Sequence, residues 1–135
     1  MSGLEIIIEG ADPQPAAAEL VALVQGFGAD AAVSTPDAAS DEARRAVDPI
    51  ALTALIVAIP PGVLAVLQLG DRIADRLEKR RRAKQLLERA RQIRTTRKVE
   101  FHVVGKDGSR QLLTLTEDEV LDLAEAKERD ASDNP

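Results

Sequence analysis

An uncharged segment, Pro49 to Gly70, is the feature that most constrains what this chain can fold into. Half of its residues are Leu, Ile or Val, and a dense basic run from Arg72 to Lys98 follows it directly. A stretch of roughly 20 apolar residues is long enough to cross a bilayer as a helix. The same stretch can also be the buried root of a long helix that binds a partner.

The sequence Pro60-Pro61-Gly62 interrupts this segment. A proline pair removes backbone hydrogen bonds and clashes with the preceding helical turn. We therefore expect an apolar helix over residues 50–59, a kink or tight turn, and a second helix from about Val63 to Arg94. The apolar positions of this second helix follow a helical period, which predicts that the helix lies against an apolar surface of its own or another chain. They are Val66, Leu69, Ile73, Leu77, Ala83, Leu87 and Ala90.

Charge is strongly segregated along the chain, although the net charge is only -5. Residues 1–48 carry a net charge of -7, residues 72–98 carry +9, and residues 99–135 carry -6. The simplest consequence is attraction within or between chains. The chain has no Cys, so disulfides and thiolate metal sites are excluded. Its start also lacks the pattern of a signal peptide, and we expect a cytoplasmic protein.

The N-terminal part predicts a strand, a helix and a second strand. Leu4 to Glu9 is rich in β-branched residues and partly alternates, as strands do. Ala16 to Gln25 has apolar residues at helical spacing, and Gly26-Phe27-Gly28 ends that helix. Residues 30–34 are then expected to form a short strand.

The C-terminal third predicts a β-hairpin. Lys98 to Val104 alternates apolar and polar residues, and Arg110 to Leu115 provides the second strand. We prefer a three-residue loop, Lys106-Asp107-Gly108, to a two-residue Asp-Gly turn. The three-residue loop would pair Val99 with Leu115 and Phe101 with Leu113.

A capping box follows the hairpin. Thr116 and Glu119 have the spacing at which each side chain bonds the other residue's backbone, and Leu115 and Val120 can form the accompanying hydrophobic staple. This pattern predicts a helix that begins here and runs to about Arg129.

Together these elements predict one α+β domain with the element order β-α-β-α-β-β-α, its helices packed on one face of a mixed or antiparallel sheet. The split βαβ, or ferredoxin-like, arrangement is the closest common topology. The chain divides into an N-terminal β-α-β part (1–34), a linker (35–48), an apolar and then basic helical insertion (49–97), the hairpin with the closing helix (98–129) and a frayed tail (130–135).

No catalytic, cofactor-binding or metal site can be assigned from the residues. The single His, His102, lies within a predicted strand without a readable nucleophile or carboxylate partner, which favours a structural role. Helix capping already explains the carboxylates of Glu117-Asp118-Glu119. Neither Gly105-Lys106-Asp107-Gly108 nor Gly26-Phe27-Gly28 has the spacing of a phosphate or dinucleotide loop. We therefore predict a protein that is not an enzyme and uses no cofactor.

The basic run has three interpretations. It can be a solvated face that pairs with acidic segments of its own or another chain, or the cytoplasmic flank of a membrane helix. As a third alternative, Lys79 to Lys84 could bind the phosphates of nucleic acid. The pI of about 4.9, the acidic flanks and the lack of a nucleic-acid motif argue against this third interpretation.

The membrane interpretation has a definite orientation. An inner-membrane span over residues 49–70 would place the acidic N-terminal part outside and the basic part in the cytoplasm. However, the prolines weaken insertion, and a span would separate the N-terminal β-α-β part from the hairpin with which it is expected to pack. We therefore favour an apolar helical element that buries surface against another protein chain.

The order of these features resembles the effector-associated constant components of bacterial conflict systems. The resemblance covers most of the chain and includes the opening strand Leu4 to Gly10, the broken apolar stretch at Pro60-Pro61-Gly62, the basic Arg80-Arg81-Arg82, the hairpin Val99 to Gly108 and the closing helix. It implies a non-enzymatic adaptor that binds an effector protein or associates with itself. A single-pass membrane-tethered adaptor anchored by residues 49–70 is the alternative.

Overall fold

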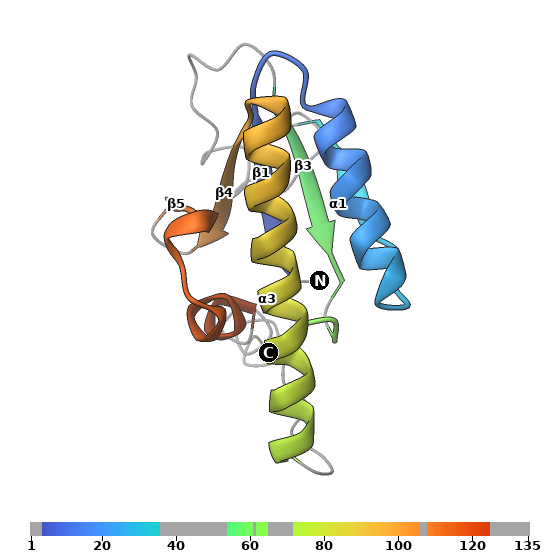
Figure 1. The fold of residues 1–135 in the computed structure, drawn as a ribbon, viewed down its shortest axis with the longest axis vertical. Coiled ribbons are helices and arrows are strands. Elements are labelled where there is room, and N and C mark those ends of the chain that lie inside the picture. Colours follow the sequence, from blue (N-terminus) through green and yellow to red (C-terminus); the bar gives the residue numbers. More distant parts are fainter. Residues whose placement is uncertain (1–3, 36–53, 61, 65–71, 106–107, 125–135) are drawn as a thin grey trace, which may run out of the picture.

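Five antiparallel strands form one sheet, and its central strand is the isoleucine-rich segment near the N-terminus. The computed structural model describes residues 4–35, 54–60, 62–64, 72–105 and 108–124. Within them the sheet has the order β2-β3-β1-β4-β5. Figure 1 shows β4, β1 and β3 side by side behind α3. The strands are β1 (Leu4–Glu9), β2 (Ala32–Ser34), β3 (Ala54–Ile59), β4 (Glu100–Gly105) and β5 (Gly108–Gln111), and the helices are α1 (Gln14–Gly26), α3 (Arg72–Arg97), the 3-10 turn η2 (Leu112–Thr114) and residues 117–124.

Two β-α-β units interleave in this sheet. Helix α1 joins β1 to β2, yet β3 lies between these two strands; helix α3 joins β3 to β4, yet β1 lies between those two. This interleaving is the split βαβ arrangement that the element order predicts. Strand β5 and the helix 117–124 extend the unit at the β4 edge. The predicted α+β class is therefore confirmed.

Strand β3 is the principal correction to the sequence prediction. Residues 54–59 do not form the end of an apolar helix; they pair antiparallel with β1 on one side and with β2 on the other. A short apolar run fits a buried helix and a buried strand equally well by periodicity. Here the β-branched residues Ile56, Val57 and Ile59 suit a strand that is covered on both faces. Residues 50–53 of the predicted helix lie outside the described residues.

The turn after β3 follows the proline pair as expected, but the long helix begins later than predicted. The Val63 N–H donates to the Pro60 carbonyl at 3.4 Å, and Gly62 has a positive φ of 94°. Val63 and Leu64 are buried without being helical. Helix α3 begins at Arg72 rather than Val63, and the predicted positions Val66 and Leu69 lie outside the described residues.

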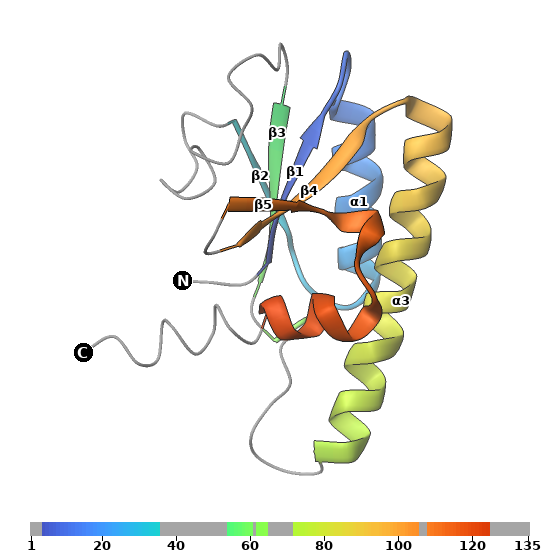
Figure 2. The same cartoon turned by 90° about the vertical axis from the view of Figure 1, so that its left-hand side faces the viewer.

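Both main helices cover one face of the sheet, as Figure 2 shows. Leu4, Ile6 and Ile8 of β1 belong to the core cluster between this face and the helices. Ile7 points to the opposite face, where it clusters with Ile56 and Val104. The central strand therefore buries side chains on both faces, and its run of three isoleucines reflects this.

The hairpin forms as predicted, but its register is one residue away from the preferred one. His102 pairs with Gln111 and Gly105 with Gly108, so the two loop positions are 106 and 107. In this register Leu112, rather than Leu113, follows on the same face as the buried Val103. The chain leaves the sheet there, and the η2 turn buries both Leu112 and Leu115.

The capping box that begins the last helix is confirmed. The Thr116 N–H donates to Oε1 of Glu119 at 3.0 Å, and the Glu119 N–H donates to the Thr116 hydroxyl oxygen at 3.2 Å. Leu115 and Val120 are both buried, as the hydrophobic staple requires. The helix is described over residues 117–124, and its predicted continuation and the tail lie outside the described residues, as does most of the linker.

The predicted membrane anchor, residues 49–70, is not a continuous helix, because its residues 54–59 form strand β3 within the sheet. In the part of the chain that the structure describes, no helix combines the length and apolar character that crossing a bilayer requires.

Substituting Gly10 is expected to destabilise the fold, because β1 passes the start of β4 closely at this point. A Cβ at Gly10 would lie 2.8 Å from Cγ1 of Val99. We expect Gly10→Ala to lower the free energy of unfolding by about 1–3 kcal/mol through overpacking. Gly26→Ala is the matched control, since its Cβ would meet nothing within 4 Å and alanine favours a helix. Urea unfolding measures the free energy of unfolding of both variants. Equal changes in the two would contradict the close approach of Gly10 to Val99.

The capping box should also make the free energy of unfolding depend on pH. The Thr116 N–H donates to the Glu119 carboxylate and lowers the pKa of that carboxyl below 4.5, assisted by the Arg110 guanidinium. The contribution is therefore complete above the unfolded-state pKa and is lost as the pH falls through the lower folded-state pKa. We expect the difference in urea midpoint between the natural chain and Glu119→Gln to shrink between about pH 7 and pH 3. A difference independent of pH would contradict this linkage.

Candidate functional site

Helix α3 is the element whose surface is least explained by the fold. Its 26 residues extend over about 39 Å, and its N-terminal part projects beyond the sheet and α1, as Figures 1 and 2 show. The buried residues of the helix are confined to its middle and C-terminal part: Lys79, Ala83, Leu86, Leu87, Ala90 and Ile93. The first third of α3 is therefore an extension of the domain rather than part of its core.

Two basic residues bind the turn after β3 at the point where the buried part of α3 begins. Lys79 is only 6% exposed, and its Nζ donates to the Gly62 carbonyl. Nη1 of Arg82 donates to the Val63 carbonyl at 3.2 Å. Because Lys79 is buried, its pKa is lowered from the usual 10.5, and the neighbouring Arg82 lowers it further. These two bonds satisfy carbonyls of a turn that forms no ladder with another strand.

Arg82 also connects α3 to the end of α1. Its guanidinium carbon lies 5.5 Å from the centre of the Phe27 ring, within the range of a cation–π interaction. Its Nε lies 3.4 Å from Oε1 of Glu78, one turn earlier in the helix. A single side chain thus joins the helix, the turn and the C-terminal end of α1.

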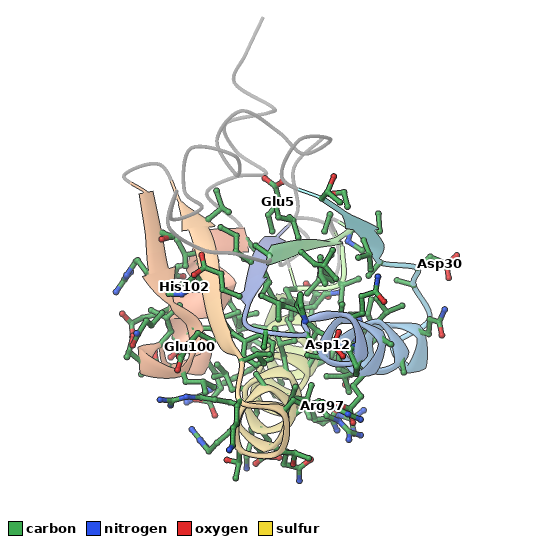
Figure 3. All side chains as sticks on the ribbon, turned by 90° about the horizontal axis from the view of Figure 1, so that it is seen from above. Glu5, Asp12, Asp30, Arg97, Glu100 and His102 are labelled. Atoms are coloured by element: carbon green, nitrogen blue, oxygen red, sulfur yellow. The ribbon has the colours of Figure 1, made fainter. Side chains whose placement is uncertain are left out.

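Many of the remaining basic residues of α3 pair with the acidic parts of the same chain. Nη2 of Arg76 lies 3.4 Å from Asp118 and 3.6 Å from Asp122, both in the helix 117–124. At the other end, Arg97 lies 3.2 Å from Glu19 of α1; Figure 3 labels Arg97 at this end of α3. Arg94 lies 3.4 Å from Glu100 at the start of β4. The charge segregation of the sequence is therefore partly satisfied within the domain.

The outward side of α3 combines exposed apolar and basic side chains. Ile73 is 75% exposed and Leu77 is 62% exposed, so these two predicted apolar positions do not pack against the domain, whereas Ala83, Leu87 and Ala90 are buried in it. Lys84 and Arg91 follow Leu77 at intervals of seven residues, and Arg80 follows Ile73 at the same interval. Residues seven apart lie nearly above one another on a helix. We call these five residues the α3 stripe.

Two of the three cations of the α3 stripe have no carboxylate partner among the described residues. Lys84 and Arg91 are exposed, and neither forms an ion pair with another described residue. The side chain of Arg80 is 56% exposed, and Asp118 is the described carboxylate that approaches it, at 3.9 Å. Cations that border the body of the domain, such as Arg94 and Arg97, thus have carboxylate partners, whereas Lys84 and Arg91 have none among the described residues.

A shallow hollow of about 570 Å³ lies beside the C-terminal half of α3. Its wall is mixed in charge and comes from this helix and from Glu19 of α1: Glu19, Glu88, Arg89, Arg91, Gln92, Ile93, Thr95 and Thr96. The Thr95 hydroxyl donates to the Arg91 carbonyl at 3.0 Å, so it is engaged by its own helix. This hollow assembles no nucleophile with a neighbouring base among its lining residues.

The other residues that the sequence singles out do not converge on a common site in the described part of the chain. His102, which Figure 3 labels on β4, is half-buried. Its Nε2 lies 3.9 Å from Oε2 of Glu9. Glu119 caps its helix and Asp118 faces Arg76, while no cluster of potential ligands for a metal ion occurs within the described residues. Gly26-Phe27-Gly28 ends α1, with φ of 88° at Gly28. Residues 106 and 107 of the glycine loop lie outside the described residues.

Sequence reasoning missed the role of Lys79 and Arg82, because nothing in a basic run distinguishes the residues that turn inward. One signal was available: positions 79, 83, 86, 90 and 93 form a helical stripe that is apolar except at Lys79. A lysine in such a stripe is expected to reach a buried acceptor.

We expect Arg82→Ala to destabilise the domain by about 1.5–3 kcal/mol, because a charged donor to a part-buried carbonyl is lost together with the contact to Phe27. Arg81→Ala is the matched control. The side chain of Arg81 is 67% exposed and pairs with Glu78 of the same helix, so the change in the free energy of unfolding should stay within about 0.5 kcal/mol. Urea unfolding at neutral pH measures both variants. Equal stabilities for the two would show that Arg82 does not hold α3 to the turn.

Comparison with protein-family models, with curated proteins and with solved structures finds no match in any of the three. The resemblance to the effector-associated constant components therefore stays a prediction.

Proposed function

We propose that this protein is a non-enzymatic interaction module that binds another protein chain through the projecting part of α3. The observation that carries the proposal is the pair of exposed apolar side chains Ile73 and Leu77, one turn apart on a helix that is otherwise strongly basic. If the apolar residues of α3 served only to stabilise the domain, they would be expected only where the helix packs on the sheet and on α1.

The rest of the domain supports this role by holding α3 firmly. Its buried half packs on the sheet and on α1, and Lys79 and Arg82 fasten it to the turn after β3. A contact element that is rigid before binding loses little conformational entropy on association. In the family that the sequence resembles, the partner would be an effector protein.

Substituting the two exposed residues should separate binding from stability. Exposed side chains contribute little to folding, so Ile73→Ser combined with Leu77→Ser should change the free energy of unfolding by less than about 0.5 kcal/mol. Burial of a Leu or Ile side chain in an interface is worth about 1.5–3 kcal/mol, so the double variant should lower affinity for the partner at least about tenfold.

The absence of Cys allows the partner to be trapped at a defined position. A photoreactive label on Leu77→Cys should form a discrete adduct with one protein in an extract of the cells that produce this chain. The matched label on Ala22→Cys, at an exposed position of α1, should not form it. The adduct partner, once purified, is then titrated with the natural chain and the double Ser variant. Identical adducts from both positions, or equal affinities, would overturn the proposal.

A further inference from the structure

We infer that the partner presents to the α3 stripe an acidic helix, with apolar residues near one end and carboxylates at heptad intervals along the remainder. The inference rests on the proposed function and specifies the chemistry of the partner. It is carried by the order of side chains along the stripe, in which Ile73 and Leu77 come first and Arg80, Lys84 and Arg91 follow.

The charges of the stripe indicate that the partner carries negative charge. The domain supplies carboxylates to the cations that border its body, such as Arg94 and Arg97. It supplies none of its described carboxylates within ion-pair distance of Lys84 or Arg91. An anionic partner is therefore complementary to this surface, and such complementarity accelerates encounter and fixes register. A second copy that presents its own α3 would be repelled along this part of the stripe.

The spacing of the stripe indicates a helical partner. Leu77, Lys84 and Arg91 lie about 10.5 Å apart along the axis, at 1.5 Å per residue. A partner helix packed nearly parallel to α3 repeats its contacts at the same seven-residue interval. A strand presents residues to one face at intervals of roughly 6.6 Å and its multiples, which do not match.

The composition of the stripe argues against two other anionic partners, a membrane surface and nucleic acid. A helix that lies in a membrane interface needs a broad apolar face, and α3 has used its apolar face on the sheet, leaving Ile73 and Leu77. Binding of nucleic acid relies on basic side chains at the phosphates, to which two exposed aliphatic residues contribute nothing.

The test uses the full chain and a labelled synthetic helix of about four heptads, with two Leu residues near one end and Glu at the heptad positions. A second peptide has Lys in place of each Glu. Fluorescence anisotropy should show binding of the acidic peptide to the natural chain. Lys84→Glu combined with Arg91→Glu should weaken this binding at least about tenfold and should create binding of the Lys peptide.

A matched control separates the stripe from net charge. Arg81→Glu combined with Arg89→Glu changes the net charge equally at exposed positions of α3 outside the stripe, and it should leave the affinity within about threefold. Equal weakening by the two double variants would overturn the inference. Tighter binding of phosphatidylglycerol vesicles or of a DNA duplex than of the acidic peptide would overturn it as well. If no peptide binds while the label at position 77 still traps a protein, this inference fails and the proposed function stands.

Discussion

The pairing of β1 on both of its edges is the constraint on which the rest of the structure depends. Strand β1 comes first in the chain, yet its partners β3 and β4 come from the middle and the C-terminal third. Because backbone groups in a buried strand must be hydrogen-bonded, β1 cannot occupy the core until both partners are in place. The two helices that carry the chain between these strands must then lie on one face of the sheet.

This topology explains why α3 both stabilises the domain and projects from it. The helix connects β3 to β4 across the sheet, and its buried residues end where the sheet and the turn after β3 end. The residues before Lys79 have no sheet beneath them. None of those whose burial is described is buried, and Ile73, Ala74 and Leu77 are exposed although they are apolar. The presence of Ile73 and Leu77 at this place is the reason we consider α3 a contact element.

The charge distribution follows from the same arrangement. Burial of one side of α3 brings its borders near α1, β4 and the helix 117–124, where Glu19, Glu100 and Asp118 meet its arginines. Exposed ion pairs of this kind contribute little to stability individually. Their effect on the surface is larger, because they neutralise the flanks of the helix and leave positive charge on its outward side. Several exposed cations of α3 thus stay without a carboxylate partner among the described residues, among them Lys84, Arg89 and Arg91.

Elements with strong local signals could be predicted from the sequence. Strand β1, helix α1 and the capping box at Thr116 and Glu119 depend on periodicity, on breakers and on side chains three residues apart. The hairpin was predicted with the wrong register, because a glycine on each side of Lys106 and Asp107 is compatible with more than one turn type and loop length. Residues 54–59 were assigned to a helix, because a short apolar run carries no period that excludes one.

What the sequence determined by itself was the α+β class, the order of most elements and the sites of the breaks, since these follow from local preferences. Only the tertiary structure decided that 54–59 joins the sheet, because that choice depends on the open edge of β1, far away in the chain. Likewise, the sequence determined that α3 is basic with a sparse apolar stripe. Which cations turn inward, which meet carboxylates and which face outward depends on where the sheet ends beneath the helix, and this is a property of the packed domain alone.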